Sequence, residues 1–129
     1  VGIKKAGDSV TVDKAEYHIE DAGTWEAAAR HIALFLLLAS RRGLTSDLVD
    51  KPALAADPVG YLLSDWGGAL IGRDMLSERG RAFAVAHYDA YLETYAAAVS
   101  RLDGDGVYDD VDLAGLVVEL TPWFDERHA

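Results

Sequence analysis

The first candidates for chemistry in this 129-residue chain are its histidine and carboxylate side chains, and the chain has no cysteine. Its four histidines are His18, His31, His87 and His128, which lie far apart in the sequence. None of them has a second metal ligand at the spacing that a shared helix would require. No nucleophile stands in a recognisable catalytic motif beside them. The sequence therefore predicts no catalytic residue, no cofactor and no metal site, and we expect a protein that is not an enzyme.

The carboxylates are concentrated near the C-terminus. The formal net charge is −10, and residues 103–126 contain eight acidic residues without a lysine or arginine. Binding to a phosphate backbone needs lysine and arginine to displace counterions, and an anionic membrane surface repels such a chain. We therefore expect neither nucleic acid nor a membrane as a partner. A basic protein is the partner that this charge favours.

Part of this acidic run resembles a calcium-binding loop. If Gly106 takes the sixth position of an EF-hand in "RLDGDGVYDDVD", four aspartates fall at positions three, five, nine and twelve: Asp103, Asp105, Asp109 and Asp112. The first position would then be Arg101, where a carboxylate ligand is required, and the last would be aspartate instead of the usual bidentate glutamate. The pattern therefore favours an acidic loop between two helices over a calcium site.

The most apolar passage predicts the central helix of the fold. Its uninterrupted apolar run, residues 32–39, is too short to cross a membrane. Thr24 can cap the start of a helix, and Gly43 stands where a left-handed residue ends one. Apolar residues cover nearly the whole circumference: Trp25, Ala28, Ala29, Ile32, Leu34, Leu36, Leu37, Leu38 and Ala39. Such a helix must be surrounded by other elements.

The remaining patterns predict further helices. Asp57-Pro58 starts one that ends at Gly67-Gly68, and a long one runs from Glu78 to Leu102 with a stripe that includes Tyr88, Tyr91 and Tyr95. An amphipathic segment from Leu113 is followed by a new helix start at Thr121-Pro122. Residues 9–12 alternate as in a single strand or an extended arm. We expect one all-α domain over residues 1–129, a compact bundle of four to five helices (24–129) with a short extended N-terminal arm (1–23).

The two long helices also admit a ligand pocket between them. His31 shares a face with apolar residues, and His87 lies one turn from Tyr91. A pocket near His31, His87 and Tyr91 would make the protein a small-ligand binding module. Hydrogen-bonded histidines inside a packed core are the structural alternative, and a homo-oligomer without catalysis is another.

Several longer stretches resemble an uncharacterised family of small acidic helical bacterial proteins. They are "DKAEYHIED", "AARHIALFLLLASRRGL", "SERGRAFAVAHYDAYLETY" and "VYDDVDLAGLVVELTPWFDERH". The family pattern H-I-x-x-F-L followed by R-G-L matches His31, Ile32, Phe35, Leu36 and residues 42–44. The second pattern departs at positions 87 and 88, where a histidine-tyrosine pair stands. In size, acidity and style the chain is similar to immunity proteins that neutralise bacterial toxins.

These observations together predict a partner-binding function. We expect a cytoplasmic protein-binding domain that occludes a basic toxin or another basic protein, guided by charge and docked through an aromatic patch. The absence of cysteine is consistent with a reducing compartment. The expected contact residues are Asp89, Glu93, Asp103, Asp105, Asp109, Asp110 and Asp112.

Overall fold

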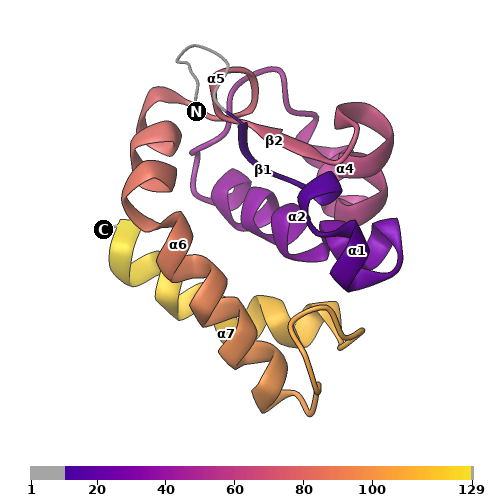
Figure 1. The fold of residues 1–129 in the computed structure, drawn as a ribbon. Coiled ribbons are helices and arrows are strands. Elements are labelled where there is room, and N and C mark those ends of the chain that lie inside the picture. The colour runs from indigo at the N-terminus through magenta and orange to yellow at the C-terminus, as the bar shows by residue number, and fades with distance from the viewer. Residues whose placement is uncertain (1–10, 129) are drawn as a thin grey trace.

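The computed structural model describes residues 11–128, which form a mostly helical fold with one small sheet (Figure 1). In chain order the elements are β1 (Thr11–Lys14), the 3-10 helix η2 (Ala15–Tyr17), α1 (Ile19–Ala22), α2 (Trp25–Arg41), α3 (Lys51–Ala56), α4 (Pro58–Trp66), β2 (Ala69–Ile71), α5 (Gly72–Met75), α6 (Glu78–Arg101) and α7 (Leu113–His128). The helical character was predicted correctly. The four-to-five-helix, all-α bundle was wrong, because the described residues contain seven α-helices and two paired strands.

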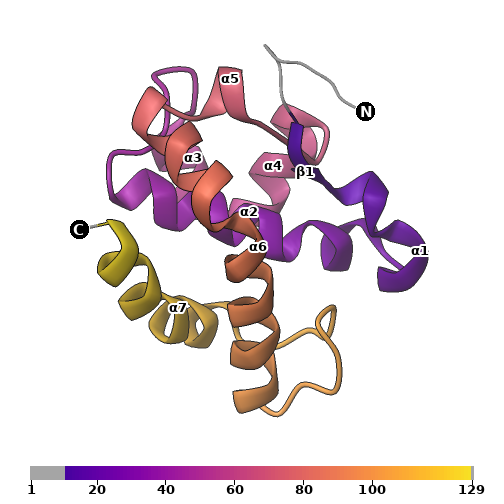
Figure 2. The ribbon, with the colours of Figure 1, turned by 60° about the vertical axis from the view of Figure 1, so that its left-hand side comes forward.

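Helix α2 is the centre of the fold, as its composition predicted. Every residue from 27 to 39 except Arg30 is buried, including Leu34, Leu37 and Leu38. The other helices surround it (Figure 2), and it contacts α1, α3, α4, α6 and α7. Thr24 accepts a hydrogen bond from the Ala27 backbone N–H, and Gly43 takes the left-handed conformation after the last turn. Nowhere in residues 11–128 is a helix both long and apolar enough to span a bilayer.

The N-terminal segment is part of the fold, which corrects the expected arm. Strand β1 pairs with β2 in an antiparallel sheet, with Thr11 opposite Ile71 and Lys14 opposite Ala69. Residues 9 and 10 of the predicted strand lie outside the described residues. The sequence signal was weak because β2 is only three residues long and follows two glycines. The pairing matters because it fixes Asp13, midway along β1, against the central helix.

Helix α6 supplies an aromatic layer over α2. The Ser77 side chain caps its start by accepting from the Gly80 N–H, and Tyr88, Tyr91 and Tyr95 are all buried. The Phe35 ring of α2 lies 5.0 Å from both the Tyr88 and Tyr91 rings, centre to centre. Edge-on and tilted contacts of this kind stabilise aromatic clusters. The predicted tyrosine stripe therefore forms part of the core.

Helix α7 runs unbroken through Pro122, so the predicted restart at Thr121-Pro122 was wrong. Proline removes one helical N–H and normally interrupts a helix. Here Leu116, Leu120 and Phe124 are buried at steps of four, which anchors the same helical face on both sides of the proline. Tertiary packing therefore overrides the local break.

The crossing of α2 and α6 can be tested at Gly80. A Cβ atom at this position would collide with the backbone carbonyl oxygen of Leu44, just after α2. We expect Gly80→Ala to lower the free energy of unfolding by about 2 kcal/mol, since a backbone atom cannot move aside as a side chain would. Gly106→Ala is the matched control, because nothing lies within 4 Å of its Cβ position. Urea unfolding of both variants measures their free energies of unfolding. A Gly80→Ala variant as stable as the wild type would contradict this crossing of α2 and α6.

Candidate functional site

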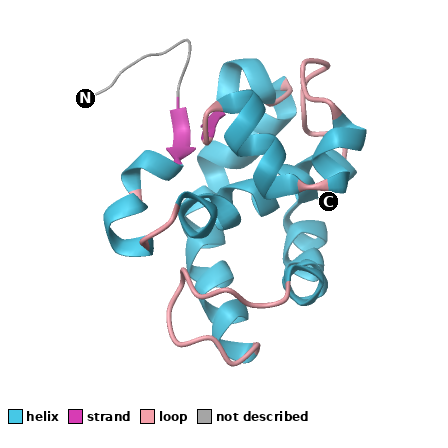
Figure 3. Cartoon of the chain, turned by 90° about the vertical axis from the view of Figure 1, so that its right-hand side faces the viewer, coloured by secondary structure: helices cyan, strands magenta, loops and turns pink. Residues whose placement is uncertain are grey.

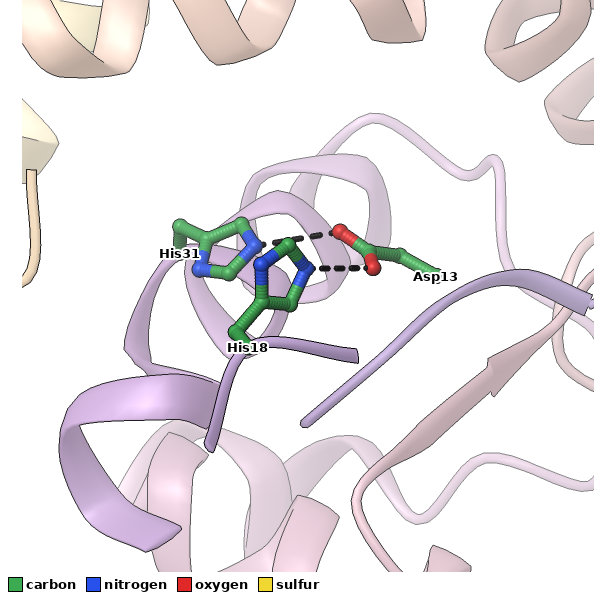
Figure 4. Close-up of side chains that lie close together, drawn as sticks. All are labelled: Asp13, His18 and His31. Carbon is green, nitrogen blue, oxygen red and sulfur yellow. Dashed lines mark hydrogen bonds and ion pairs between the residues drawn. The ribbon is translucent and has the colours of Figure 1, made fainter. Parts of the chain in front are cut away.

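The strongest concentration of polar groups inside the molecule surrounds Asp13. Asp13 is only 5% exposed, yet its carboxylate accepts four hydrogen bonds, one of them from the Lys14 backbone N–H to Oδ1 at 2.8 Å. His18 Nε2 donates to Oδ1 at 2.7 Å, while His31 Nε2 at 3.0 Å and the Tyr88 hydroxyl at 2.7 Å donate to Oδ2. Figure 4 shows the two imidazole rings converging on the carboxylate from one side. We name Asp13, His18, His31, Tyr88 and Tyr108 the Asp13 cluster.

Four separate elements position these side chains. Asp13 lies in β1, and His18 occupies the turn between η2 and α1. His31 lies in the second turn of α2, and Tyr88 lies near the middle of α6. Because β1 is held by β2 and α6 is held by its aromatic layer, the donors and the carboxylate meet only in the completed fold.

A second layer of contacts holds the two histidines. The Tyr108 hydroxyl lies 2.7 Å from His18 Nδ1, and the Tyr91 hydroxyl donates to the backbone carbonyl of His31 at 2.6 Å. The two imidazole rings are perpendicular, with centres 4.6 Å apart. His31 Nδ1 is buried and has no hydrogen-bond partner within residues 11–128, and neither has the hydroxyl of Tyr95, whose ring lies 5.9 Å away from that of His31. The cluster is thus well connected at His18 and incompletely satisfied at His31.

The hydrogen bonds decide the ionisation of Asp13. Burial alone raises the pKa of a carboxyl, but the bonds from His31, Tyr88 and His18 outweigh it, so the pKa of Asp13 lies below its ordinary value. Burial raises the pKa of Tyr88 well above its ordinary value, and the adjacent Asp13 charge adds to this effect. Asp13 is therefore a buried anion, and Tyr88 is a neutral donor to it.

The acidic loop, residues 103–112, adjoins this cluster. It connects α6 to α7 (Figure 3). The Arg30 guanidinium donates to the backbone carbonyls of Tyr108 and Asp109, each at 3.3 Å, and pairs with Asp110 at 3.6 Å. Asp109 accepts from the Asp105 and Gly106 N–H groups. The loop is therefore tied both to the central helix and to itself.

The expected partner-binding residues lie mostly at the surface. Asp103, Asp105, Asp110 and Asp112 are exposed and Asp109 is half-buried, while Asp89 and Glu93 lie exposed on α6. Four of the eight acids in residues 103–126 pair with arginines of this chain: Asp110 with Arg30, Glu119 with Arg101, Asp125 with Arg42 and Glu126 with Arg127. The unpaired negative charge in the described C-terminal third is thus concentrated in the acidic loop.

Two of the loop aspartates accept hydrogen bonds from backbone N–H groups. Asp109 and Asp112 accept N–H groups within or just after the loop. The one group of three or more potential metal ligands in residues 11–128 is instead Asp13, His18 and His31, whose ligand atoms lie within 4.8 Å of one another. The expectation of no metal site overlooked this group.

Of the expected pocket residues, His31 and Tyr91 are in contact in the core, but His87 lies apart from them. His31 and Tyr91 are buried in the core, whereas His87 packs on Phe83, with ring centres 4.9 Å apart, in a separate surface hollow of about 310 Å³. Arginine and histidine side chains give this hollow a basic character that would suit a small anion, and its lining is Leu44, Arg79, Ala82, Phe83, Ala86, His87, Arg127 and His128.

Two large aromatics are exposed in the segment that leads into the start of α2. Tyr17 is 64% exposed and precedes His18, which contacts the loop residue Tyr108. Trp25 is 50% exposed at the start of α2, one and a half turns before Arg30. The sequence placed Trp25 on the apolar stripe of α2, but only the later positions of that stripe are buried. Exposed aromatics beside a polar rim are typical of protein-binding surfaces.

Sequence reasoning missed Asp13, His18, Tyr88 and Tyr108 as a group. The one usable signal was His31 on an apolar helix face, since a buried imidazole needs a polar partner. That signal cannot select one partner among 22 acidic residues. Comparisons of the chain with protein-family models, with curated proteins and with solved structures gave no match in any of the three. The site is therefore interpreted from its own geometry.

The pH dependence of stability tests the ionised state of Asp13. A carboxyl whose native pKa lies below its unfolded value of about 4 contributes stability above that value and loses it as the pH falls through the native pKa. We expect Asp13→Asn to be about 3 kcal/mol less stable than the wild type at pH 7, because donors in the cluster lose their anionic acceptor. The difference in the free energy of unfolding between the two proteins should become smaller as the pH falls from about 5 towards 2. Urea unfolding across this pH range measures the difference, and a difference that does not change with pH would contradict a buried anion.

Proposed function

We propose that this protein is a cytoplasmic protein-binding domain that occludes a basic partner, in the manner of an immunity protein. The docking surface consists of the acidic loop together with Tyr17 and Trp25. One observation carries the proposal: the acidic loop is fixed to the central helix by Arg30 while most of its carboxylates remain exposed. A partner would therefore meet a charged surface that needs little ordering on binding.

The aromatics and the charges have separate tasks. Tyr17 and Trp25 offer large apolar area with few rotatable bonds, which is the composition of binding hot spots. The loop carboxylates attract a basic protein over a distance and raise its association rate. Asp21 of α1 adds to the negative charge near the loop. Burial of Tyr108 raises the pKa of its hydroxyl, and the nearby Asp21 charge raises that pKa further. Asp89 and Glu93 extend the negative surface along α6.

Site-specific photo-crosslinking tests where a partner docks. A photoreactive phenylalanine analogue is placed at position 17 or 25, and at position 48 as the control, because Leu48 is 67% exposed beyond the other end of α2. In extracts of the native cell, we expect the first two probes to capture the same basic protein and the third to capture none of it. Asp103→Asn, Asp105→Asn and Asp112→Asn together should reduce the capture. Equal capture at all three positions would refute this docking surface.

The association rate of the purified pair tests steering by charge. We expect the association rate constant to fall at least about tenfold between roughly 0.02 and 0.5 M salt, because ions screen the loop carboxylates. The triple asparagine variant should show a flatter dependence while keeping its fold, since asparagine at position 112 still caps α7. Stopped-flow tryptophan fluorescence follows the reaction. Identical salt dependence in the variant and the wild type would rule out steering by the loop.

A further inference from the structure

We infer that Asp13, His18 and His31 form a binding site for a divalent transition metal of the zinc type. This site is independent of the docking surface proposed above. The three side chains offer two imidazole nitrogens and one carboxylate oxygen, and these ligand atoms already lie within 4.8 Å of one another. Neutral imidazole with carboxylate suits zinc, cobalt, nickel and iron far better than calcium or magnesium. Three protein ligands would leave a position for water or a further ligand.

The ligand atoms lie in a range that a bound metal can draw together. The Nε2 atoms of His18 and His31 lie 2.7 and 3.0 Å from Oδ1 and Oδ2 of Asp13, respectively. Ligand atoms around a tetrahedral zinc ion at about 2.0 Å lie about 3.3 Å apart. Each imidazole would move slightly away from its present carboxylate oxygen, and ligand atoms that now lie up to 4.8 Å apart would close towards that spacing. His18 can supply this movement, because it lies in a turn and its side chain is 20% exposed, whereas those of Asp13 and His31 are nearly enclosed.

Both histidines can give up the hydrogen that Nε2 now donates. The hydrogen can move to Nδ1, which leaves Nε2 free to bind the metal. At His18 the Nδ1 partner is the Tyr108 hydroxyl, which can accept as readily as it donates. At His31 the Nδ1 atom has no partner in the described part of the chain, so the moved hydrogen would lack an acceptor and the metal bond must replace the Nε2 bond to Asp13. His18 is therefore the better prepared of the two imidazole ligands.

The surroundings favour a cation. Tyr88 donates to Asp13 and Tyr108 contacts His18, so an outer layer that orients metal ligands is already present. The partly exposed side of the site, at His18 and Tyr108, lies near the carboxylate of Asp21, whose charge contributes to raising the pKa of Tyr108. Negative charge beside the entrance raises the local concentration of metal ions.

Cobalt(II) and zinc(II) added to the tag-free protein test the site. We expect one equivalent of Co²⁺ to produce visible absorption bands that saturate and that Zn²⁺ abolishes. We also expect Zn²⁺ at about a hundred times its Kd to raise the Tm by about 5 °C or more. His18→Gln should weaken binding at least about tenfold, while the surface controls His87→Gln and His128→Gln should bind as the wild type does.

Ring-nitrogen NMR of the wild type provides a test that needs no variant. Zinc should shift the Nε2 resonances of His18 and His31 and leave those of His87 and His128 in place. Failure to saturate at one equivalent, unchanged binding by His18→Gln, or shifts confined to His87 and His128 would each overturn the proposal. Partner capture through Trp25 in the presence of a chelator does not depend on this site, so failure of either proposal can be recognised separately.

Discussion

The fold depends on a buried carboxylate. Removing the Asp13 charge from water is costly, and three short hydrogen bonds from His18, His31 and Tyr88 compensate for that cost. These donors come from the N-terminal segment, the central helix and α6. One side chain therefore joins three parts of the chain that are not paired with one another as strands and occupy separate ranges of the sequence.

This arrangement connects the interior to the surface. His18 contacts both Asp13 and Tyr108. Arg30, one residue before His31, donates to the backbone carbonyls of Tyr108 and Asp109. The acidic loop is thus linked to the core by two contacts, one through an imidazole and one through a guanidinium. The metal site and the docking surface are separate proposals, but they share this connection.

Sequence reasoning succeeded where a local signal was strong. The cap at Thr24 and the left-handed Gly43 follow from short-range rules, and the structure confirms both of them. It failed where distant contacts decide the outcome. Helix α7 continues through Pro122 because its buried face is anchored on both sides, and β1 finds β2 across more than fifty residues. The Asp13 cluster belongs to the second kind, since Asp13 and Tyr88 are 75 positions apart.

The hydrogen positions on the imidazoles of His18 and His31 report whether Asp13 is an ionised acceptor. An ionised Asp13 can only accept, so Nε2 of both His18 and His31 must carry a hydrogen in the metal-free protein. Long-range nitrogen–proton NMR of the histidine rings near neutral pH should show both Nε2 atoms protonated and His31 Nδ1 bare. A His31 ring protonated at Nδ1 alone would contradict the account, because Asp13 would then lack that donor and the fold its central link.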